Sequence, residues 1–137
     1  MKGDYRKKVR KKLIREKAVI AVYQYLLTQA TEEEIENYLK SYYAPRMDEN
    51  EIELCKEIVC HVIEQQAQYD EILVQHLKKG WSIDRLSLMN HAILLVAFYD
   101  LSHTPKEIVV NEAVELTKKY GDEEDYKFIN GVLSAIG

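Results

Sequence analysis

The stretch from residue 108 to 133 constrains the fold more than any other part of the chain, because it predicts two helices joined by a tight break. Apolar residues recur at helical spacing up to Tyr120, and Gly121 can take the left-handed conformation that ends many helices. Asp122 then predicts the N-cap of a second helix with an acidic first turn. Gly131 falls in the middle of that helix, where glycine costs about 1 kcal/mol relative to alanine. We therefore expect a neighbouring helix to approach Gly131 closely.

The rest of the chain also predicts helices. Five Gly and two Pro among 137 residues favour long helices over a many-stranded sheet. Helix starts are predicted by the capping residues Thr31, Asp48 and Ser87, and the polar run Gln65–Gln68 predicts a helix break. We expect an all-α, single compact domain of about seven helices in two packed sub-bundles. Their expected limits are a three-helix half at about 7–66 and a four-helix half at about 67–137.

Motifs for catalysis, cofactors and metals are missing from the sequence. Cys55 and Cys60 fit a reducing compartment and match no zinc spacing, and the four histidines lie in four separate segments. There is no phosphate-binding glycine loop and no catalytic motif of the common hydrolase or protease types. The longest apolar run, 92–99, is too short to span a bilayer. We therefore expect a soluble cytoplasmic protein that is not an enzyme and holds no cofactor or metal.

The N-terminal segment carries a charge asymmetry that the net charge of −4 conceals. Residues 1–17 hold nine basic and two acidic side chains, a local charge of +7, which leaves −11 on the rest. This asymmetry predicts a polyanionic partner. A solvated, charged helix end is the alternative interpretation. On a helix predicted at about 7–29, the residues of one positive face are Lys8, Lys11, Lys12 and Arg15, with Tyr23 further along the same line.

Five motifs together resemble the NusB family of transcription antitermination factors. The resemblance is strongest from residue 81 onward, looser near the N-terminus, and little more than a helical pattern at 30–78. The motifs are, in chain order, Ala21–Gln24 (A-V-Y-Q), Trp81–Leu86 (W-x-x-x-R-L), Asn111–Leu116 (N-E-A-V-E-L), Lys119–Gly121 (K-Y-G) and Lys127–Leu133 (K-F-I-N-G-V-L).

The resemblance implies an RNA-binding factor that pairs with the small-subunit ribosomal protein NusE. The pair would bind a boxA-type single-stranded RNA, link nascent ribosomal RNA to the transcription elongation complex and support processive transcription. Tyr23 and Asn90 match positions near the protein partner, and some family members form homodimers. Phe128 matches an aromatic near the RNA, with a core aromatic as the alternative. The candidate RNA-binding residues are Lys7, Lys8, Arg10, Lys11, Lys12, Arg15 and Phe128.

A second hypothesis is a NusB-like protein-interaction adaptor without RNA binding. It is kept open by departures from the family pattern, in which Leu13, His91 and Leu95 stand where basic residues are common. Lysines also replace several family arginines, and lysine cannot form the two-pronged phosphate contact of arginine. Salt dependence separates the two hypotheses, because contact with about four phosphates of a single strand predicts a slope near −3 for log K against log salt.

Overall fold

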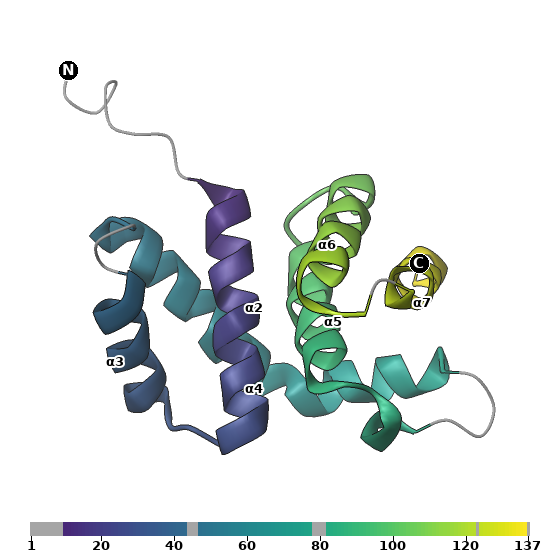
Figure 1. The fold of residues 1–137 in the computed structure, drawn as a ribbon, viewed down its shortest axis with the longest axis horizontal. Coiled ribbons are helices and arrows are strands. Elements are labelled where there is room, and N and C mark those ends of the chain that lie inside the picture. Colours follow the sequence, from purple (N-terminus) through teal and green to yellow (C-terminus); the bar gives the residue numbers. More distant parts are fainter. Residues whose placement is uncertain (1–9, 44–46, 78–81, 123, 137) are drawn as a thin grey trace.

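The computed structural model describes residues 10–43, 47–77, 82–122 and 124–136, and these ranges fold into helices without any strand (Figure 1). This confirms the all-α prediction. The elements are α2 (Lys11–Thr28), α3 (Glu32–Tyr43), α4 (Glu49–Gln75), the 3-10 turn η1 (Ile83–Arg85), α5 (Leu88–Leu101), α6 (Lys106–Tyr120) and α7 (Asp125–Ala135).

The predicted N-caps are confirmed by their hydrogen bonds. Thr31 Oγ1 accepts from the backbone N–H of Glu34, and the Glu34 carboxylate accepts from the backbone N–H of Thr31. Asp48 and Glu51 form the same reciprocal pair at the start of α4. Ser87 Oγ accepts from a backbone N–H in the first turn of α5. Each cap satisfies backbone donors that a helix start leaves without intrahelical partners.

The expected helix break at Gln65–Gln68 is wrong, because α4 runs without interruption from Glu49 to Gln75. Glutamine and alanine favour helix, so a polar run alone does not end one. The Gln66 side chain also donates to Asp70 one turn on, at 3.3 Å. Because α4 passes through the expected boundary near residue 66, its two ends belong to different parts of the molecule. The division into a three-helix and a four-helix half stays a prediction.

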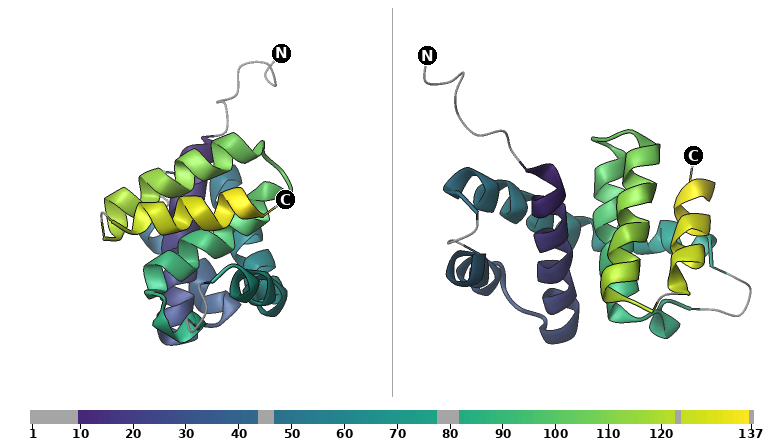
Figure 2. Two further views of the ribbon diagram at one scale, coloured as in Figure 1. Left: turned by 90° about the vertical axis from the view of Figure 1, so that its right-hand side faces the viewer. Right: turned by 45° about the horizontal axis from the view of Figure 1, so that its top comes forward.

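The helices are arranged around α2 and α5, which pack against each other in the middle of the molecule (Figure 1). α4 crosses behind both, so that α3 packs on one end of α4 while α5 packs further along it. α6 and α7 form an antiparallel pair on the far side of α5 (Figure 2). Between Asn90 and Phe98 every residue of α5 is buried, which fits its nearly uninterrupted apolar sequence.

Three expectations about the α6–α7 connection are wrong. Gly121 ends α6 in an extended conformation, with φ −105° and ψ −168°, and not in the left-handed one. α7 begins at Asp125 without a side-chain cap, so Asp122 is not its N-cap. A Cβ added to Gly131 would meet nothing within 4 Å, so no neighbouring helix explains that glycine. A Cβ at Gly121, by contrast, would lie 3.1 Å from the Thr117 carbonyl oxygen and 3.3 Å from Asn90 Oδ1. Close packing is therefore the reason for Gly121.

In the part of the chain that the structure describes, no helix combines the length and the apolar character needed to cross a lipid bilayer.

Candidate nucleic-acid interface

The basic residues at the start of α2 do not form one exposed face. Lys11 and Lys12 are exposed, and Arg10 just before the helix is half exposed, with 51% of its side chain accessible. Within the described ranges Lys11 makes no ion pair, whereas Lys12 and Arg10 each contact a carboxylate. The candidates Lys7 and Lys8 lie outside the described residues.

Arg10 is held by Glu51, which forms the capping box of α4 together with Asp48. Its Nε donates to Glu51 Oε2 at 2.9 Å, its Nη2 to Oε1 at 2.6 Å, and its backbone N–H to Oε2 at 3.1 Å. The hydrogen bonds from Arg10, opposed by burial, lower the pKa of the Glu51 carboxyl to about 2. Glu51 is 2% exposed, so this contact fixes the start of α2 against α4.

Arg15 points into the protein and is only 9% exposed. Its Nε donates to Asp100 at the end of α5, and its Nη1 donates to Glu112 on α6. Burial raises the pKa of the Asp100 carboxyl, and the nearby guanidinium partly opposes that rise. Arg15 thus joins three helices, and its donors are directed at one buried and one partly buried carboxylate.

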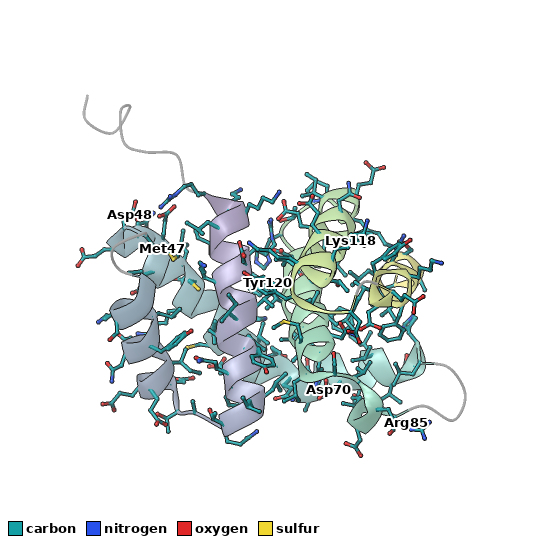
Figure 3. The ribbon with its side chains drawn as sticks, viewed as in Figure 1. Met47, Asp48, Asp70, Arg85, Lys118 and Tyr120 are labelled. Carbon is teal, nitrogen blue, oxygen red and sulfur yellow. The ribbon has the colours of Figure 1, made fainter. Side chains whose placement is uncertain are left out.

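A charged groove of about 240 Å³ separates α2 from α6 and is bridged by ion pairs. Lys12 Nζ lies 2.9 Å from Glu115 Oε1. One turn further along α2, Glu16 accepts hydrogen bonds from Lys119 and from the Tyr120 hydroxyl, and Figure 3 shows Tyr120 between the two helices. Burial disfavours ionisation of Glu16, but these two donors outweigh it and lower the pKa of its carboxyl. Acidic residues of α6 therefore occupy the space that a phosphate would need beside Lys12.

The two candidate partner-binding residues lie at different depths. Tyr23 is half buried against the core. Asn90 is 5% exposed, and its Nδ2 donates to Asp125 Oδ2 at 2.9 Å, so it fastens α5 to the start of α7. Asn90 Oδ1 is buried beside Gly121 without a hydrogen-bond partner among the described residues. In this structure Asn90 serves the packing of α5, α6 and α7.

Phe128 is half buried on α7 and packs against the core. Figure 1 places α7 on the opposite side of α6 from α2, so the structure does not bring Phe128 together with the basic residues of α2. One strand would have to pass across α6 to meet both. The structure thus unites Arg10, Lys11 and Lys12 and separates them from Phe128.

The two residues of α5 that depart from the family pattern, His91 and Leu95, are both buried. His91 lies 2.6 Å from Asp70 of α4, which Figure 3 labels near the start of α5, and Leu95 is a core residue. Neither is available to an external partner in this structure.

Sequence reasoning missed the acidic partners of the basic residues. The capping pattern that includes Glu51 could have been predicted from the sequence. Glu112 and Glu115 of the N-E-A-V-E-L motif could likewise have been placed on one side of a helix. Their pairing across 41 to 103 residues of sequence depends on the packing of α2 against α4, α5 and α6, which no local pattern encodes. The ring contact between Tyr99 and His103 could have been predicted from the sequence, because residues four apart in a helical segment lie next to each other.

Comparison with known proteins places the chain in a family. The family model described as NusB matches residues 12–137. A transcription antitermination protein NusB from Burkholderia vietnamiensis is 38% identical over 133 residues, which cover 95% of this chain and 89% of that protein. The NusB protein of Staphylococcus epidermidis is 51% identical over 81 residues, which cover 58% of this chain and 62% of that relative, less than two thirds of its length.

The fold agrees with these matches. A crystal structure of the antitermination factors NusB and NusE in complex with double-stranded RNA contains a chain that superposes with a TM-score of 0.80. The superposition covers 92% of this chain and 94% of that one, at 28% sequence identity. Family membership also supports the prediction that the chain is not an enzyme. The chain belongs to the NusB family of transcription antitermination proteins.

Proposed function

We propose that this protein pairs with a NusE-type ribosomal protein and, with it, binds a boxA-type single-stranded RNA. In this proposal the complex tethers nascent ribosomal RNA to the transcription elongation complex in the cytoplasm. The similarity to a NusB chain in a complex with NusE and RNA supports it. The observation that carries it is the cluster of Arg10, Lys11 and Lys12 at the end of α2 that follows the strongly basic residues 1–9.

Phosphate binding is proposed to use exposed cations more than buried ones. Lys11 is exposed without a carboxylate partner in the described chain, so it can meet a phosphate at no cost in broken contacts. Arg10 and Lys12 must exchange a carboxylate for a phosphate. Arg15 would have to leave the buried Asp100 and the partly buried Glu112 uncompensated, which would destabilise the fold. We therefore assign Lys11, Arg10 and Lys12, together with Lys7 and Lys8, to RNA and give Arg15 a structural role.

The test is a titration of labelled boxA-type RNA into the protein, with and without NusE. RNA affinity that rises when NusE is present supports the proposal. A complex with NusE that has no RNA affinity at low salt contradicts it.

A helical adaptor without RNA binding is the second candidate function. The observation that favours it is the intramolecular neutralisation of Arg10, Lys12 and Arg15 by carboxylates. The same titration separates the two, because an adaptor binds NusE and leaves the RNA free. A homodimer that covers the basic residues is a further possibility for the isolated chain, and sedimentation with and without NusE tests it.

A further inference from the structure

An open pocket of about 160 Å³ lies at the same end of α2 as the basic residues, where α2, α4 and the end of α5 meet. One wall is aliphatic and is formed by Ile14, Leu54 and Ile58. Because Ile14 is buried and the other two are half buried, the wall is part of the folded core and is already formed before anything binds.

A pair of stacked rings also lines the pocket. Tyr99 and His103 lie with centroids 4.4 Å apart and planes inclined by 21°, and both line the pocket. His61 of α4 supports Tyr99 edge-on at 5.0 Å and contacts the Tyr69 hydroxyl through Nε2 at 3.2 Å. The rings are thereby held in place, although His103 itself is exposed.

Two exposed side chains of opposite charge also line the pocket. Lys11 and Glu57 both line the pocket and are exposed. Asp100 on the inner side is already compensated by Arg15. The pocket therefore combines an apolar slot with an ammonium group for an anion and a carboxylate for a hydrogen-bond donor.

We propose that this pocket binds one unstacked cytosine of the RNA strand held by the basic residues at the start of α2, an inference that rests on the proposed function. A cavity of about 150 Å³ admits one benzene ring, so the slot suits a six-membered base. The base lies between the aliphatic wall and the rings, as bases do on single-strand binding surfaces. Lys11 Nζ contacts the phosphate of the same nucleotide. Glu57 accepts from the cytosine N4 amino group, whereas uracil presents a carbonyl there.

The first experiment fills the pocket. Ile58→Trp occupies the slot, and Ile72→Trp, at an exposed position of the same helix, is the matched control. Labelled oligocytidylate and oligouridylate of about ten nucleotides are titrated into each variant with NusE present, a length within the range of single-strand sites. We expect the unmodified protein and the control to bind the cytidine strand about five- to tenfold more tightly than the uridine strand. We expect Ile58→Trp to lose that preference and about tenfold in affinity.

The second experiment uses a surface change that leaves the core intact. Glu57→Gln can both accept and donate, so the preference for the cytidine strand should fall towards one. Glu53→Gln, also exposed on α4, should keep the preference.

The outcomes separate this inference from the proposed function. If Ile58→Trp and Glu57→Gln keep the same preference for the cytidine strand as the unmodified protein, the inference about the pocket is wrong, whereas the proposal of RNA binding is unaffected. A variant that loses NusE affinity but keeps its RNA affinity assigns the pocket to the protein partner and also overturns the inference. Absence of RNA binding by the unmodified protein at low salt overturns both.

Discussion

Arg15 shows how burial decides which cations of α2 can meet a polyanion. The sequence places it on one helical face with Lys11 and Lys12, and helical geometry alone cannot distinguish the three. In the fold, the Arg15 side chain points towards α5 and α6, where it forms ion pairs with Asp100 and Glu112. Removing one partner of a buried ion pair leaves an uncompensated charge, which costs more than the pair itself contributes.

Arg15→Gln should lower the free energy of unfolding by about 3–5 kcal/mol at pH 7. Burial already raises the folded-state pKa of the Asp100 carboxyl, and the variant loses the guanidinium that partly opposes this rise. The added loss of stability is therefore fully present above the raised pKa and shrinks as the pH falls through it. Urea unfolding followed by circular dichroism at pH 7 and pH 5 measures both effects. Lys11→Gln, which removes the same charge from an exposed position, should change stability by less than about 0.5 kcal/mol. An Arg15→Gln protein as stable as its parent contradicts the structural role.

Glu115→Gln should increase RNA affinity about two- to fivefold, because an exposed carboxylate competes with phosphate for Lys12. The effect should vanish in a protein that also carries Lys12→Gln, if Glu115 acts through that lysine. Glu107→Gln, at an exposed position of the same helix, controls for the change in net charge. Fluorescence anisotropy with NusE present measures the RNA affinity of the parent, of Glu115→Gln, Lys12→Gln and Glu107→Gln, and of the double variant. A gain of the same size for Glu107→Gln would mean that the ion pair itself has no part in it.

At the scale of helices, local sequence patterns predicted where helices begin better than they predicted where helices end and how they are connected. Thr31, Asp48 and Ser87 cap helices as predicted, because capping depends on residues within one turn. The expected break at Gln65–Gln68 was wrong because glutamine and alanine favour helix, so polarity alone does not mark a helix end. The expectation for Gly121 was wrong because this glycine is required by close packing against Thr117 and Asn90, and Asn90 belongs to another helix.

The two C-terminal glycines should respond to alanine with opposite signs. Gly121→Ala forces a Cβ against the Thr117 carbonyl oxygen and Asn90, so we expect a loss of about 1–3 kcal/mol in the free energy of unfolding. Gly131→Ala puts a methyl group into open space on a helix, so we expect a gain of up to about 1 kcal/mol. Thermal and urea unfolding of the two variants provide the measurement. Losses of equal size would show that Gly131 is also closely packed.

Glu51→Gln should weaken the attachment of α2 to α4 and flatten the acid dependence of stability. The folded-state pKa of Glu51 is depressed to about 2 from 4.5, so its contribution is present above pH 4.5 and is lost as the pH falls towards 2. Glutamine keeps the capping geometry but not the charged contact with Arg10, so we expect a loss of about 1–3 kcal/mol at pH 7. Unfolding measured between pH 7 and pH 2 tests this, with exposed Glu53→Gln as control. The same acid dependence in Glu51→Gln as in the parent contradicts it.

For the molecule as a whole, the sequence predicted the helical class and the family, whereas the site required the fold. Apolar periodicity and few turn residues were sufficient for the class, and the motifs at 81–86 and 111–133 for the family. The charge count of residues 1–17 predicted a basic end of the chain. It could not show that most of the described cations there already contact acids from α4, α5 and α6. Those contacts form only when helices distant in sequence pack together.

RNA binding through the exposed end of α2 is the central claim, and a salt series tests it most directly. Affinity for a boxA-type RNA is measured with NusE present at several salt concentrations, for the parent and for Lys11→Gln combined with Lys12→Gln. We predict a slope of log K against log salt near −3 for about four phosphate contacts, and a shallower slope by about one to one and a half for the double variant. Binding that is independent of salt, or a slope that the double variant leaves unchanged, would contradict the claim.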